Sequence, residues 1–154
     1  MSEAPTLTPG AVLALDLGER RIGVAVSDRR RILASPMAVL QRSGDRRAEH
    51  AAILKLVLEA EATMVVIGLP LSLSGARGPA AEKAMLEIAE LERELPVPVV
   101  ALDERLSTVE AHRRLRELRG SERTSRSRAK KERAVVDDKA AAILLESFLA
   151  RAQQ

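Results

Sequence analysis

Acidic side chains stand at the ends of three apolar segments of the sequence. They are Asp16, Asp103, Glu104, Asp137 and Asp138. Carboxylates that gather in a partly desolvated place repel one another and stay ionised only when cations neutralise them. Hard oxygen ligands suit Mg²⁺ or Mn²⁺, and two such ions about 3.5–4 Å apart can clamp a phosphodiester during hydrolysis. The pattern therefore favours metal-assisted hydrolysis of a phosphate ester.

Each acidic position also has an ordinary structural interpretation. An aspartate at a strand end, such as Asp16, commonly forms a turn by bonding to its own backbone. Asp103 and Glu104 are compatible with a solvated turn. Acidic residues at the start of a helix, such as Asp137 and Asp138, favour the positive end of the helix dipole in any case. The hydrolytic interpretation therefore requires the three places to converge in the fold.

Basic residues are concentrated in one part of the chain. The whole sequence carries a formal charge of +3, but residues 105–133 contain eleven lysines and arginines and four glutamates, which leaves −4 elsewhere. A basic stretch beside an acidic body is typical of a phosphate-binding surface, although a solvated charged helix and loop would look the same. The candidate nucleic-acid contacts are Arg20, Arg21, Arg77, Arg105, Arg126, Arg128, Lys130 and Lys131.

The composition excludes several other classes of site. The absence of cysteine removes disulfides, thiolate catalysis and zinc fingers. Phe148 is the sole aromatic residue, so base stacking cannot carry recognition, and backbone charge and shape must do so. No apolar run approaches the length needed to cross a bilayer, and no signal peptide is evident, so we expect a cytoplasmic protein without a membrane partner.

The length and the patterning predict one α/β domain. The 154 residues, 46% of them apolar, suffice for a single core, with a flexible leader at 1–10 and the domain at 11–152. Hydrophobic runs predict five strands in a mixed sheet, at 11–17, 21–27, 31–40, 63–67 and 97–102. Helices are predicted at 46–60, 79–95, 107–119 and 137–150. Loops are predicted at 68–79 and, because of its charge, at 120–132.

The two histidines and the glycine-rich loop are weaker candidates. His50 and His112 lie in charged helical stretches, and we expect both to face solvent without a metal or general-base role. The loop from Gly68 to Gly78 lacks the Gly-Lys-Ser/Thr of a Walker sequence, although its amides ahead of a helix could meet an anion.

Four motifs of the sequence resemble those of one known family. They are LDLGERRIGVAVSD at 15–28, VIGLPL at 66–71, LDERLSTVEA at 102–111 and VDDKAAAILL at 136–145. The chain resembles the YqgF-type nucleases, which are bacterial Holliday-junction-resolvase-like proteins also associated with trimming the 5′ end of precursor 16S ribosomal RNA. The resemblance extends over about residues 11–150 in the family's order.

The resemblance implies a ribonuclease H-like fold with catalytic, metal-binding acids at Asp16, Glu104 and Asp137, and Asp138 is the alternative to Asp137. It implies Mg²⁺ or Mn²⁺, in two sites, and hydrolysis of precursor 16S rRNA. Cleavage of branched DNA as a Holliday junction resolvase remains an alternative, and it would suit a homodimer. Two further alternatives are a non-catalytic nucleic-acid-binding regulator and a sugar-kinase or actin-like ATPase, whose two-lobed fold needs about twice this length.

Overall fold

The fold is one mixed sheet between two layers of helices. A computed structural model describes residues 9–70, 77–104 and 126–152, with the side chains of 126–138 excepted. The strands are β1 (Ala11–Leu17), β2 (Arg21–Ser27), β3 (Ala34–Gln41), β4 (Ala62–Leu69) and β5 (Val99–Asp103). The helices of the described ranges are α1 (Arg46–Glu59), α2 (Pro79–Glu94) and α4 (Arg126–Ala152).

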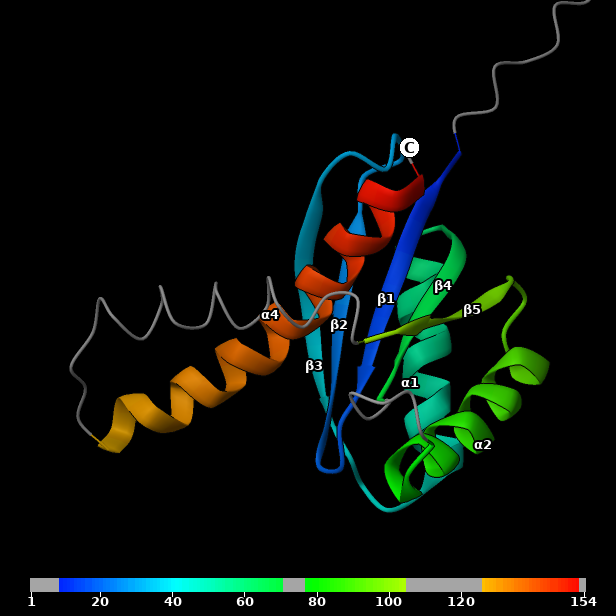
Figure 1. Cartoon of the computed structure of the whole chain (residues 1–154). Coiled ribbons are helices and arrows are strands. Elements are labelled where there is room, and N and C mark those ends of the chain that lie inside the picture. Colours follow the sequence, from blue (N-terminus) through cyan, green and yellow to red (C-terminus); the bar gives the residue numbers. More distant parts are fainter. Residues whose placement is uncertain (1–8, 71–76, 105–125, 153–154) are drawn as a thin grey trace, which may run out of the picture.

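The sheet has the strand order β3-β2-β1-β4-β5 (Figure 1). β1 pairs antiparallel with β2, β2 pairs antiparallel with β3, and β4 pairs parallel with both β1 and β5. The antiparallel hairpin turns at Gly18, where an added Cβ would lie 2.6 Å from the carbonyl oxygen of Arg21. β1 therefore occupies the centre of the sheet, and its carboxyl end lies beside that of β4.

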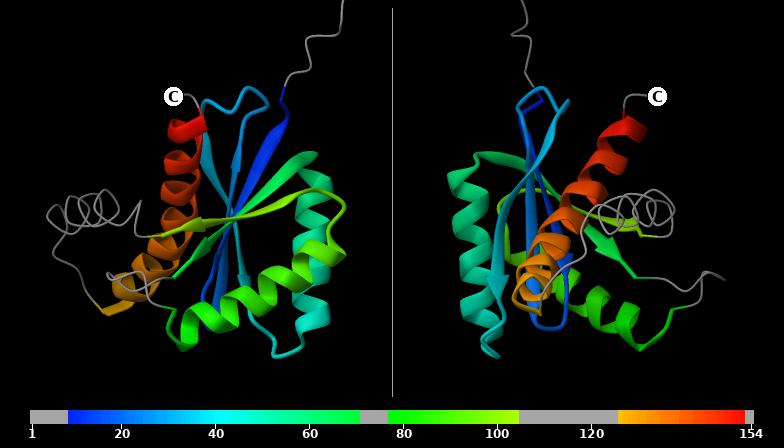
Figure 2. Two further views of the ribbon diagram at one scale, coloured as in Figure 1. Left: turned by 45° about the vertical axis from the view of Figure 1, so that its right-hand side comes forward. Right: turned by 90° about the vertical axis from the view of Figure 1, so that its left-hand side faces the viewer.

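Each face of the sheet has its own apolar core. The core between the sheet and α1 with α2 contains Leu13 and Leu15 of β1, whereas the core under α4 contains Val12 and Ala14. This alternation follows from the period of two residues in a strand. Figure 2 shows α4 on one face of the sheet and α1 with α2 on the other. Because helices cover both faces of the sheet, the sequence of β1 is an almost unbroken apolar run.

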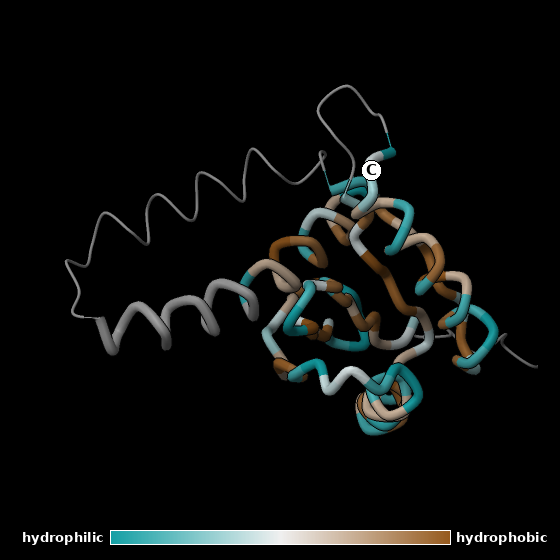
Figure 3. The backbone as a smooth tube through the Cα atoms, turned by 90° about the horizontal axis from the view of Figure 1, so that it is seen from below, coloured by the Kyte–Doolittle hydropathy of each residue, from teal (hydrophilic) through white to brown (hydrophobic). Residues whose placement is uncertain are grey.

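The hydropathy of the chain follows this layering. In Figure 3 apolar stretches run through the strands enclosed by the helices, and hydrophilic stretches lie at the outer turns. The described helices include none with the length and apolar character required to cross a bilayer.

The predicted strands and the predicted helices at 46–60 and 79–95 agree with the structure apart from shifts at their ends, and β4 continues to Leu69, so the loop predicted from Gly68 begins later. The mixed five-stranded sheet is confirmed. The prediction of a loop through residue 132 and a helix from 137 was wrong, because α4 already begins at Arg126. The stretch 126–133 is rich in lysine, arginine and glutamate, and these charged residues are also good helix formers. The predicted helix at 107–119 and the residues 120–125 lie outside the described residues.

Candidate metal and nuclease site

The side chain of Asp16 belongs to the face of the sheet that α4 covers. Val12 and Ala14 contribute to the core under α4, so the two-residue period assigns Asp16 to the same face. Asp16 lies at the carboxyl end of β1, pairs with Gly23 of β2 and is half-buried. A carboxylate in this position loses part of its hydration, which is costly without a compensating cation.

Glu104 reaches the same face at the same end of the sheet, because it directly follows the carboxyl end of β5, which runs parallel to β4 and β1. Leu102 of β5 belongs to the core under α4, and Glu104 follows it by two residues. The Glu104 amide donates to the Leu69 carbonyl oxygen at 3.2 Å, which ties the residue to the end of β4. Asp16 and Glu104 thus stand at the ends of strands that flank β4.

Gly68 of β4 leaves open the space that the Glu104 carboxylate occupies. The register pairs Leu15 with Ile67 and Gly68 with Leu102, so Gly68 is level with Asp16, and Glu104 lies two residues beyond Leu102. A Cβ built on Gly68 would lie 2.6 Å from Oε1 of Glu104 and 2.9 Å from its Cγ. The Glu104 carboxylate therefore occupies the space that a side chain at position 68 would fill.

The electrostatics of Glu104 show that the acids interact. Burial raises the pKa of Glu104 to about 7, and the negative charges of Asp16 and Asp103 add to that rise. Partial desolvation and neighbouring negative charge both make the ionised form of such a carboxyl less favourable. Perturbed groups of this kind gather at functional sites.

The third predicted acid lies on the helix that covers this face. Asp137 and Asp138 are both within α4, which packs on β1, β2 and β3. Their side chains lie outside the described part of the structure, so Asp137 and Asp138 remain alternatives. Ala141 and Leu145, one and two turns further along α4, are fully buried.

A matching family model supplies the classification of the chain. The model is described as "RuvX: Holliday junction resolvase", and it matches residues 10–151. The chain belongs to this family. The motif resemblance stated above is thereby confirmed, because the family's match extends across all three acidic positions.

Curated relatives agree with the family assignment. A protein of Roseiflexus sp. named "Putative pre-16S rRNA nuclease" is 40% identical over 141 residues, which is 92% of this chain and 94% of the relative. A protein of the same name from Koribacter versatilis is 42% identical over 147 residues, with coverage of 96% and 91%. The chain therefore spans nearly the whole length of these RuvX-family relatives.

A solved structure supports the fold. The structure described as "T. thermophilus RuvC in complex with Holliday junction substrate" superposes with a TM-score of 0.55 and 18% identity, covering 93% of this chain and 96% of that one. The likeness concerns the fold alone, and it confirms the ribonuclease H-like α/β architecture for the described part of the chain.

The predicted basic contacts lie in different parts of this RuvX-family fold. Arg20 is exposed in the turn after β1, Arg21 opens β2 and is half-buried, and Arg77 is exposed just before α2. Four others lie in the first part of α4, where only the backbone is described, and Arg105 lies outside the described residues. The four are Arg126, Arg128, Lys130 and Lys131.

A cleft of about 940 Å³ lies at the same end of the sheet but does not contain the acids. It runs from the turn after β1 to the first turns of α1 and α2, and Arg20, Arg46 and Lys83 line it. Leu17, also in its lining, shares the strand face of Leu13 and Leu15. The cleft therefore opens on the face opposite α4, and we do not count it as part of the acidic site.

Sequence analysis missed one feature of the site and misjudged one histidine elsewhere. The close approach of Glu104 to Gly68 was missed, although a glycine at the end of the buried run of β4 was a usable signal. The expectation that His50 faces solvent was wrong, because its side chain is buried and contacts Glu87 and Glu94. His112 lies outside the described residues.

Proposed function

We propose that the chain is a divalent-metal-dependent nuclease that processes the 5′ end of precursor 16S rRNA in the cytoplasm during ribosome biogenesis. The observation that carries the proposal is the position of the Glu104 carboxylate against Gly68, with the pKa of Glu104 raised to about 7 by burial and by the charges of Asp16 and Asp103. The names of the curated relatives supply the class of substrate.

The donor set fits a hard divalent cation. Asp16 and Glu104 offer carboxylate oxygens from two strand ends, and a cation bound there would offset both the burial and the neighbouring negative charges that raise the pKa of Glu104. Mg²⁺ and Mn²⁺ favour ligands of this kind, whereas the described part of this site offers neither a thiolate nor an imidazole. Asp16, Glu104 and Asp137, or Asp138 in its place, would hold two ions.

The residues of the chain then have separate tasks. When bound, the ions supply Lewis-acid stabilisation of the phosphate and lower the pKa of water. Asp16 orients the site from the rigid centre of the sheet, since β1 is hydrogen-bonded on both sides. Glu104 must be deprotonated to act as a ligand, and Gly68 leaves open the space that its carboxylate occupies. The covering helix α4 limits the access of bulk water to this face.

Helical spacing supports a third acid from α4. Asp137 precedes the buried Ala141 by four residues, and Asp138 precedes the buried Leu145 by seven. Residues at these spacings share a face of a helix, so both acids are suited to the side of α4 that meets the sheet. Both remain in the proposal for this reason.

Positive charge beside the acids supports a nucleic-acid substrate. Arg20 and Arg21 belong to the turn that follows Asp16, and the basic stretch 105–133 adjoins Glu104 in sequence. Lysines and arginines hold the phosphates that flank a cleaved bond, and this contact carries little sequence information. The substrate should therefore be recognised by backbone and shape.

The decisive experiment compares substrates and metals in one assay. The full chain is incubated with end-labelled precursor-like RNA, a four-way DNA junction and linear duplex DNA, each with Mn²⁺, Mg²⁺ or EDTA. We expect metal-dependent cleavage of the RNA that disappears in Asp16→Asn and persists in the matched control Asp45→Asn, which keeps its helix-capping oxygen. Cleavage in EDTA, or equal cleavage by Asp16→Asn, would refute the proposal.

The family description favours cleavage of branched DNA as the second candidate. A junction resolvase makes paired incisions and needs two active sites, so this activity would require a homodimer. In the same assay it predicts symmetric cuts in the four-way junction and no preference for RNA. Binding of nucleic acid without metal-dependent cleavage of any substrate would instead indicate a regulator.

A further inference from the structure

We propose that His50, Glu90 and Glu94 bind a divalent cation of the zinc class between α1 and α2. This site is separate from the acids at the ends of β1 and β5, because α1 and α2 lie on the face of the sheet opposite α4. Its effect would be to join the two helices rather than to perform chemistry on a phosphate.

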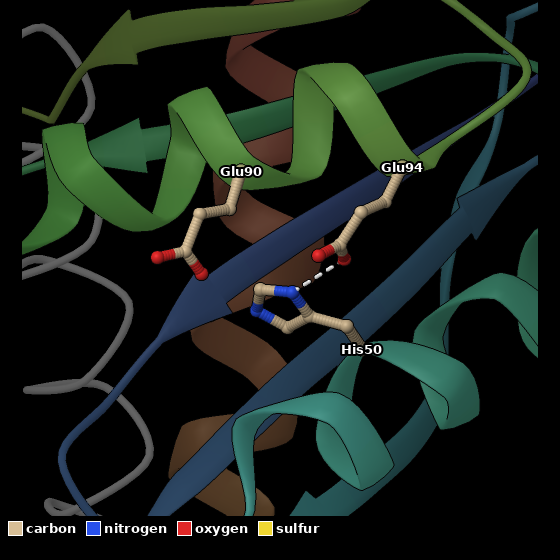
Figure 4. Close-up of side chains that lie close together, drawn as sticks. All are labelled: His50, Glu90 and Glu94. Carbon is tan, nitrogen blue, oxygen red and sulfur yellow. Dashed lines mark hydrogen bonds and ion pairs between the residues drawn. The ribbon is translucent and has the colours of Figure 1, made fainter.

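The three side chains converge from two helices. Their ligand atoms, one from each residue, all lie within 4.8 Å of one another. Glu90 and Glu94 are one turn apart on α2 and therefore share a helix face, and His50 meets them from α1 (Figure 4). One imidazole nitrogen and two carboxylates form a donor set that suits Zn²⁺, with water completing the coordination.

The hydrogen-bonding capacity of His50 supplies the main argument. Its Nε2 lies 2.8 Å from a carboxylate oxygen of Glu87, and its Nδ1 lies 2.7 Å from a carboxylate oxygen of Glu94. A neutral imidazole carries one N–H, so it can donate to one of these carboxylates but not to both. The second contact needs either an additional proton or a cation between nitrogen and oxygen.

Glu87 decides which ring nitrogen is the ligand. Arg42 donates to both carboxylate oxygens of Glu87, at 2.8 and 2.9 Å. The guanidinium of Arg42 thus pairs with Glu87 through two hydrogen bonds, an arrangement typical of an ionised carboxylate. An ionised Glu87 accepts the Nε2 proton and leaves Nδ1 with a lone pair toward Glu94 and Glu90. A carboxylate that fixes the tautomer of a histidine is typical of metal sites.

The site is accessible and its competing ion pairs are weak. The side chains of Glu94 and Glu90 are 48% and 35% exposed, and a hollow of about 290 Å³ is lined by His50 and Glu94. Arg46 lies 3.2 Å from Glu90, but it is half-exposed, and pairs of this kind contribute little. Arg47 also lines the hollow. Its positive charge would lower the affinity without blocking the ligands.

Zinc titration of three forms of the full chain tests the proposal. The forms are the wild type, Glu90→Gln/Glu94→Gln and the matched control Glu92→Gln, which changes an exposed glutamate of the same helix outside the cluster. Calorimetric titration with zinc chloride gives the number and affinity of bound ions, and the melting temperature is recorded with and without zinc. The acids Asp16 and Glu104 are present in all three forms, so any zinc that they bind cancels in the comparison.

We expect the wild type and Glu92→Gln to bind one more zinc ion than Glu90→Gln/Glu94→Gln, or to bind it at least tenfold more tightly. The melting temperature should rise with zinc more in the first two forms, because an ion that binds only the folded state stabilises it. Equal stoichiometry, affinity and thermal response in all three forms would overturn the proposal. That result would mean that a protonated His50 makes both contacts without a metal.

Discussion

Glu104 lies over Gly68 so closely that no other residue type can occupy position 68 without moving the carboxylate. A Cβ on Gly68 would come within 2.6 Å of Oε1, 2.9 Å of Cγ and 3.2 Å of Cδ of Glu104. These are the atoms of the carboxylate itself and of its stem, so the Glu104 side chain would have to move from its position. The glycine thus sets the position of the Glu104 carboxylate in the proposed nuclease site.

Gly68→Ala should therefore impair catalysis while leaving the fold intact. A displacement of about 1 Å in a catalytic group can cost about 100-fold in rate, and we expect a loss of that order. Metal-dependent cleavage and urea denaturation of the same preparation are the measurements. Gly78→Ala is the matched control, since a Cβ there meets nothing within 4 Å. Equal activity of the two variants would contradict the role assigned to Gly68.

The raised pKa of Glu104 predicts that the metal-free protein loses stability as the pH rises. In the unfolded chain the carboxyl releases its proton near pH 4.5, whereas in the folded protein it keeps the proton until about pH 7. The free energy of unfolding should therefore fall between these values and then level off. The free energy of unfolding of Glu104→Gln should not fall in this range. At pH 8 the variant should be about 1–2 kcal/mol more stable than the wild type, after allowance for solvent screening.

Urea denaturation in EDTA from pH 4.5 to pH 8 measures this effect. The matched control is Glu92→Gln, an exposed glutamate whose replacement should leave the pH dependence of the wild type unchanged. Parallel stability curves for wild type and Glu104→Gln would show that Glu104 is not held in its protonated form by the fold.

A buried ion cluster joins α1 and α2 to the end of β3. Arg42 contacts Glu87 at 2.8 Å and Glu49 at 3.0 Å, and the three side chains are between 4% and 16% exposed. Arg42→Met would leave two carboxylates buried without a cation, which typically costs about 3–5 kcal/mol. The exposed pair of Arg29 with Glu61 offers a control, and Arg29→Met should cost less than about 1 kcal/mol. Chemical denaturation at pH 7 measures the free energy of unfolding of both variants. Similar losses of stability in Arg42→Met and Arg29→Met would contradict the structural role of Arg42.

The sequence predicted those parts of the fold that depend on local pattern. β1 was correct to the residue because both of its faces are buried, which makes its run unbroken and apolar. The start of α4 was missed because the charge of residues 126–132 indicated a loop, while their helix propensity pointed the other way. Local composition gave two opposing signals there, and charge was given too much weight.

The side-chain contacts that cross between elements were harder to predict. His50 meets Glu87 and Glu94, which are 37 and 44 residues away, so no spacing in the sequence connects them. Asp16 and Glu104 were both predicted at strand ends, and the structure places them at the carboxyl ends of β1 and β5, the two strands that flank β4. The close approach of the Glu104 side chain to Gly68 depends on the register between β4 and β5, which the periodicity of the sequence does not determine.

The basic residues in the first part of α4 should govern affinity for nucleic acid rather than the rate of hydrolysis. Replacing Arg126, Arg128, Lys130 and Lys131 by glutamine removes four positive charges and keeps a good helix former at each position. Each phosphate contact contributes about 0.7–0.9 to the slope of log affinity against log salt, so the slope should fall by roughly 3 if all four take part. Cleavage at saturating substrate should stay within a few-fold of the wild type.

Binding titrations over a range of salt concentrations measure this slope. The control is the double variant Lys55→Gln/Arg93→Gln, which removes exposed charges from α1 and α2 on the opposite face of the sheet. Its slope should match that of the wild type. An unchanged slope in the α4 variant would mean that the substrate does not follow this helix, and a loss of cleavage at saturating substrate would assign the basic residues to catalysis instead.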